Sequence, residues 1–158
     1  MLRKAGRLAD AQAVLEAGLK SEPDSPRLNQ WMSMVLADEG RPRASVQYDL
    51  KARRLGGESP REIAALQQAF ASGGEPAYRR AYLRLLIEQQ GRAEALPFGY
   101  ATELATVYAE LQDRPDTMKW LLTAAQEHED APLELKSPAY AFLAGDPQFQ
   151  ALLKRVGL

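Results

Sequence analysis

The chain has 158 residues, of which 46% are hydrophobic and 26% charged, with no cysteine, one histidine and a net charge of −1. This composition is that of a soluble globular protein, and we expect a cytoplasmic location. The lack of cysteine excludes disulfides, thiolate metal sites and a cysteine nucleophile, and no apolar run approaches the roughly 20 residues of a membrane span.

Apolar residues recur at helical spacing along the chain, and prolines and glycines separate the recurring segments. Nothing alternates with period two over a useful length, so the sequence predicts an all-α fold without a sheet. The predicted helices cover residues 7–20, 27–39, 42–55, 59–73, 75–90, 100–112, 115–128 and 146–156.

The segment boundaries repeat at a fixed interval. Gly6, Gly40 and Gly74 stand 34 residues apart, and Pro26 and Pro60 keep the same interval. Self-similarity at such a period indicates a helical-repeat protein, and 34 is the period of the tetratricopeptide repeat.

The first copy resembles the second helix of a tetratricopeptide repeat. Gly6 stands at the turn, Ala11 and Gly18 are the small residues where helices touch, Leu15 fills the gap between them, and Pro23 closes the repeat.

Later copies follow the pattern less closely. In the second copy, Asp49 stands where an apolar residue is usual, which weakens the match. In the third copy, Arg79 stands where the repeat has a small residue, so we expect its two helices to pack less tightly. The fourth starts four residues late, and Gln112-Asp113 replaces its glycine turn.

The resemblance implies a right-handed tetratricopeptide-type α-α superhelix with a C-terminal capping helix, in one domain. It divides the chain into a partial repeat 1–25, repeats 26–59, 60–93 and 98–131, and a cap 132–158. Because Met1 falls where a preceding helix should end, we expect a fragment of a longer chain. The C-terminal part resembles the tetratricopeptide region of bacterial regulators that carry a winged-helix, Ser/Thr kinase or cyclase domain.

The family resemblance also implies where a partner binds. First helices of successive repeats line a concave groove that takes a peptide or a partner domain. The alternative is that the corresponding residues are solvated helix sides. By matched repeat phase the groove includes Arg27, Gln30, Met34, Asp38, Arg61, Ala64, Gln68, Thr102, Thr106 and Glu110.

Two other functions keep the same fold. The missing first helix would expose Leu8, Leu15 and Leu19, and this face could make a homodimer in a purely architectural protein. A small-molecule sensor would need an apolar pocket in the loosened region around Phe70, Arg79 and Tyr82. Trp31 and Trp120 lie beside apolar stripes, and we expect both to pack structurally.

Catalytic and metal-binding patterns are missing from the sequence. There is no Gly-x-Ser-x-Gly, phosphate-binding or dinucleotide-binding motif, and His128 has no second histidine to share a metal. We therefore expect no enzyme activity, no cofactor and no metal site.

Residues 41–92 carry a net charge of about +5 and residues 93–158 about −5, which could steer an acidic partner or favour head-to-tail self-association. The sequence pI near 5.9 argues against direct nucleic-acid binding.

Overall fold

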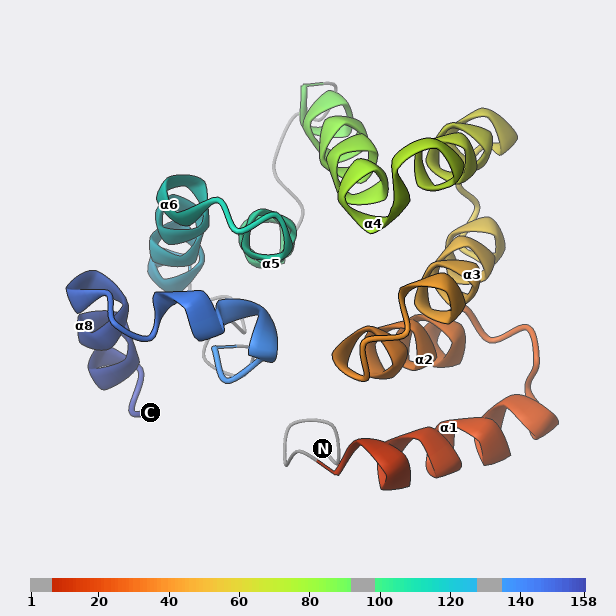
Figure 1. Ribbon diagram of the computed structural model, residues 1–158, viewed down its shortest axis with the longest axis horizontal. Helices are drawn as coiled ribbons and strands as arrows, with labels where there is room; N and C mark the ends of the chain where they lie inside the picture. Colours follow the sequence, from red (N-terminus) through yellow and green to blue (C-terminus); the bar gives the residue numbers. More distant parts are fainter. Residues whose placement is uncertain (1–6, 92–98, 128–134) are drawn as a thin grey trace. The chain divides into compact units, whose positions relative to one another are not determined.

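The computed structural model describes residues 7–91, 99–127 and 135–158, so Gly6 and His128 lie outside the described residues. Throughout those three ranges the regular elements are helices and none is a strand, which confirms the all-α prediction (Figure 1). None of the described helices is both long enough and apolar enough to cross a bilayer.

The α-helices begin and end close to where the sequence predicts them, and a 3₁₀ segment lies where the sequence predicts no helix. They are α1 Leu8–Ser21, α2 Pro26–Asp38, α3 Pro42–Leu55, α4 Pro60–Gln90, α5 Tyr100–Glu110, α6 Arg114–Gln126, the 3₁₀ segment η2 Pro138–Leu143 and α8 Pro147–Arg155. Packing is by antiparallel helix pairs, with α2 against α3 and α5 against α6 as the closest partners.

Local capping chemistry sets the helix starts. Ser25 precedes Pro26 and its hydroxyl accepts a hydrogen bond from the Leu28 amide. Thirty-four residues later, Ser59 accepts from the Glu62 amide while the Glu62 carboxylate accepts from the Ser59 amide at 3.0 Å, which is a complete capping box. These caps satisfy amides that the first helical turn leaves without partners.

Glycines with positive φ end two of the predicted helices. Gly40 has φ +69° after α2, and Gly74 has φ +63° and ψ −155°, a conformation essentially restricted to glycine. Gly73 and Gly74 therefore break α4 into two halves, as the sequence predicts, and Pro76 lies in the first turn of the second half.

The turn between α5 and α6 uses a residue other than glycine. Gln112 has φ +57°, the only such residue outside glycine within the described ranges. The Asp113 amide donates to the Tyr108 carbonyl at 3.0 Å, just as the Arg41 amide donates to the Leu36 carbonyl at 2.9 Å. The two turns are therefore closed by equivalent hydrogen bonds, with Gly40 in one and Gln112 in the other at the left-handed position.

Because a side chain is strained in the left-handed region, we expect Gln112→Gly to raise the free energy of unfolding by about 1 kcal/mol. The reciprocal variant Gly40→Gln should lower it by a similar amount, since a Cβ at position 40 would meet no atom within 4 Å and the cost is that of the backbone alone. Urea unfolding followed by circular dichroism measures both. Equal stabilities for Gln112→Gly and the wild type would contradict the explanation.

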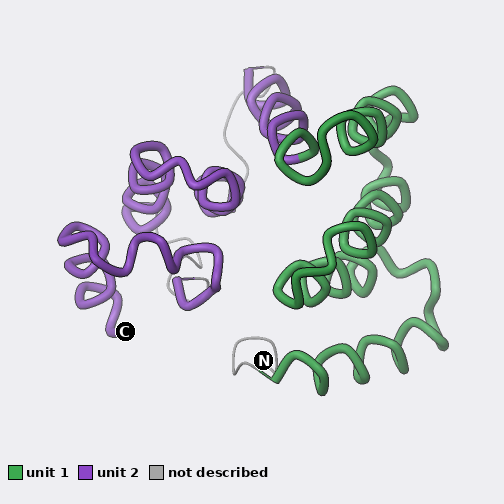
Figure 2. Tube along the Cα trace, in the orientation of Figure 1, with its two compact units in different colours: residues 1–78 green, residues 79–158 purple. Residues whose placement is uncertain are grey.

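The chain forms two compact units, Met1–Tyr78 and Arg79–Leu158, with the boundary inside the second half of α4 (Figure 2). In unit 1, a core of five buried residues joins α1 to α2: Ala11, Leu15, Met32, Val35 and Leu36. The prediction of one continuous repeat array stays a prediction.

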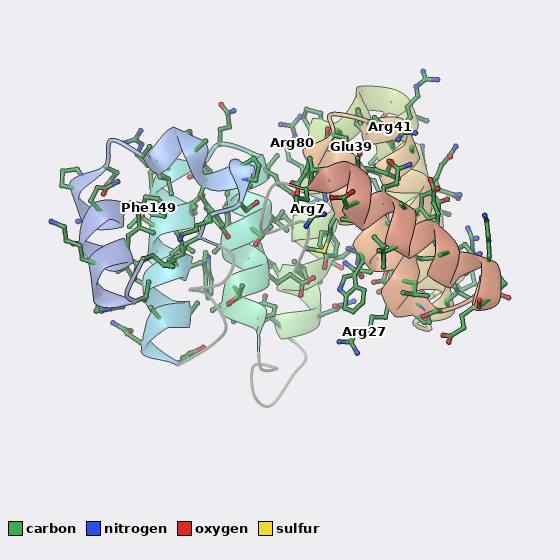
Figure 3. All side chains as sticks on the ribbon, turned by 90° about the horizontal axis from the view of Figure 1, so that it is seen from below. Arg7, Arg27, Glu39, Arg41, Arg80 and Phe149 are labelled. Atoms are coloured by element: carbon green, nitrogen blue, oxygen red, sulfur yellow. The ribbon has the colours of Figure 1, made fainter. Side chains whose placement is uncertain are left out.

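In unit 2, the segment after residue 134 contributes to the core. Tyr140 and Leu143 of η2 and Phe149 and Leu152 of α8 are buried together with Leu121 of α6. Figure 3 shows Phe149 on the inner side of α8. The predicted C-terminal helix is therefore present, and it packs as part of the core of unit 2.

Candidate partner-binding surface

The outer face of α2 carries the first four of the predicted groove residues. Buried α2 residues lie on the opposite side, and they are Asn29, Met32, Ser33, Val35 and Leu36. Arg27 and Gln30 are exposed, whereas Met34 and Asp38 are half-buried. Together with Trp31 these positions form one stripe along the helix, which we call the α2 face: Arg27, Gln30, Trp31, Met34 and Asp38.

Trp31 lies on this exposed face, and the prediction that it packs structurally beside the apolar stripe is wrong. Its side chain is 43% exposed, and the Arg27 guanidinium lies 4.5 Å from the centre of the indole ring. Figure 3 shows Arg27 at the edge of its unit, pointing away from the helices. Helical geometry explains the error, because residue 31 falls just outside the arc that Met32, Val35 and Leu36 occupy.

Trp120, by contrast, packs as the sequence predicts. Its ring meets Tyr100 edge to face, with the ring centres 6.2 Å apart, and it lies against buried residues of unit 2. Of the two tryptophans, Trp31 is therefore the exposed one.

The first half of α4 also exposes its predicted groove residues. Arg61, Ala64 and Gln68 are all solvent-exposed, because Ile63 and Leu66 turn to the core. Unlike the α2 face, these three positions include no aromatic side chain.

In unit 2 the predicted groove residues make contacts within the chain. The Thr106 hydroxyl donates a hydrogen bond to the Thr102 carbonyl at 3.0 Å, and it lies at hydrogen-bond distance, 3.0 Å, from the Tyr140 hydroxyl. Glu110 forms an ion pair with Arg79 at 2.9 Å. The C-terminal segment and α4 thus occupy positions where the family resemblance implies a groove, and the exposed part of the predicted surface lies on unit 1.

The predicted self-association face is largely covered within unit 1. Leu15 is only 7% exposed and belongs to the core with α2, and Leu19 packs against that core. Leu8 is half-buried, and the apolar residue that α1 does expose is Val14, at 62%. Dimerisation through Leu15 would require separating it from α2.

A buried polar network in unit 1 was missed by sequence reasoning. Asp49 accepts from Arg53 at 2.7 Å and from the Tyr78 hydroxyl, and Arg53 also pairs with Glu58 at 2.7 Å. Asp49, read from the repeat pattern as a weak position, is thus the acceptor that joins α3 to the second half of α4. The i,i+4 spacing of Asp49 and Arg53 is the signal that could have revealed it.

The same network holds the Tyr78 phenol in its neutral form. Burial, and then the negative charge of Asp49, raise the pKa of Tyr78 well above its ordinary value. The phenol therefore stays protonated near neutral pH and donates its hydrogen bond to Asp49.

Within the part of the chain that the structure describes, no three metal-ligating side chains come together. No protein-family model, curated protein or solved structure matches the chain in the three comparisons made.

Proposed function

We propose that the chain is a protein-interaction module of the tetratricopeptide type, which binds a peptide or partner domain on the α2 face and the first half of α4. The single observation that carries this proposal is the exposed Trp31 with Arg27 stacked on it. Tryptophan and arginine are the side chains most enriched at the energetic centres of protein interfaces.

Several features support the repeat assignment on which the proposal depends. Helices α2 and α4 begin at prolines 34 residues apart, each after a capping serine, and Gly40 and Gly74 turn the chain at the same interval. A module of this kind would serve as the interaction or regulatory region of a larger bacterial regulator.

The proposal is tested by selecting displayed random 15-residue peptides on the immobilised protein and measuring the enriched peptides by fluorescence anisotropy. We expect Trp31→Ala to weaken their binding at least about tenfold, because the indole supplies the largest apolar contact on the face. Ile87→Ala is the matched control, since Ile87 is an apolar residue of α4 with a similar exposed fraction, 46%. No enrichment, or equal loss in both variants, would contradict the proposal.

A further inference from the structure

In the Arg27–Trp31 pair, a guanidinium that can bind a carboxylate lies over an exposed aromatic ring that can pack against an apolar side chain. A guanidinium carries its N–H donors in its own plane, so a group that stacks over a ring can still present donors to a ligand beside it. With 4.5 Å between Arg27 and the indole centre, the stacking restricts the side chain before any partner arrives. A restricted side chain loses less entropy on binding.

Arg27 has no acidic partner among the residues that the structure describes. Its guanidinium lies over the Trp31 ring, and Arg27 takes part in none of the ion pairs within the described residues. The α2 face carries a single carboxylate, Asp38, eleven residues further along and thus about 16 Å away along the helix. The face itself is therefore positively charged at its Trp31 end.

Helix stability does not explain this positive charge. Arg27 lies in the first turn of α2, where the helix dipole favours acidic side chains. The same Ser-Pro-Arg triplet recurs at residues 59–61, and the exposed Arg61 likewise has no recorded ion pair within the described residues. Both arginines are therefore exposed and available to a negatively charged partner.

From these observations we infer that the partner of the α2 face is an acidic peptide segment, with a carboxylate side chain bound by Arg27 and a neighbouring aromatic or aliphatic side chain packed on Trp31 and Met34. This inference rests on the proposed function and names its ligand class. Charge complementarity selects the carboxylate, and the exposed indole selects the apolar neighbour.

The test repeats the peptide selection with Arg27→Glu and compares the enriched sequences with those from the wild type. The wild type should enrich peptides with Asp or Glu next to an aromatic or aliphatic residue. Arg27→Glu should bind those peptides at least about tenfold more weakly and enrich Lys or Arg at the same place. The variant should fold normally, since an acidic residue suits the first turn of a helix. Arg155→Glu on α8 makes the same charge change at an exposed site away from the face.

Each outcome bears on the inference separately from the proposed function. If the enriched peptides depend on Trp31 but show no acidic bias, the binding module stands and the acidic partner is wrong. Equal selections from Arg27→Glu and the wild type, or equal effects of Arg27→Glu and Arg155→Glu, would also overturn it. If no peptide is enriched at all, both the module and its ligand class fail.

Discussion

Replacing Arg53 by methionine is expected to lower the free energy of unfolding by about 3–5 kcal/mol near neutral pH. Arg53 is 9% exposed in its side chain and is the cation between the carboxylates of Asp49 and Glu58. Methionine preserves much of the side-chain volume. It removes the positive charge between the Asp49 and Glu58 carboxylates and the hydrogen bonds that Arg53 donates to them. The loss is a large part of the 5–15 kcal/mol by which domains are usually stable.

The neighbouring residue supplies the control for this experiment. Arg54 is exposed, and Arg54→Met removes the same charge from the next position of α3. We expect no measurable loss of stability in urea unfolding of Arg54→Met. If the two variants unfold at the same urea concentration, the buried network does not stabilise unit 1.

A second large effect is expected in unit 2. Leu121 of α6 is 0% exposed and is surrounded by core residues of α5, η2 and α8. Leu121→Ala should cost about 2.5–5 kcal/mol, because it removes buried methyl groups and leaves a cavity that the packed helices cannot fill. Thermal unfolding monitored by circular dichroism measures the loss.

The adjacent leucine separates a cavity effect from a change in helix propensity. Leu122 lies on the same helix but is only half-buried, so Leu122→Ala should cost about 1 kcal/mol. Equal losses in the two variants would show that the segment after residue 134 does not close over α6 as described.

The helices themselves were predictable from the sequence. Apolar spacing located them, and serine, proline and glycine marked their ends to within about two residues, because capping and positive φ are local requirements. The repeat pattern placed the fourth turn at Gln112-Asp113 without glycine, and the structure shows Gln112 in the left-handed conformation there.

The candidate site was predictable only in part. The repeat phase placed Arg27, Gln30 and Arg61 on exposed faces, and these positions are exposed in the structure. It could not show that Thr106 contacts Tyr140 or that Glu110 pairs with Arg79, because those partners come from distant segments of the chain.

The sequence by itself therefore determined the helical class, the helix boundaries and which side of each helix tends to be polar. These properties depend on interactions between residues a few positions apart. Only the tertiary structure decided that Trp31 is exposed, that Leu15 is covered and that Asp49 is buried with Arg53 and Tyr78. Burial of a single residue depends on which helix packs over it, and one residue of rotation, about 100°, moves a side chain from the core to the solvent.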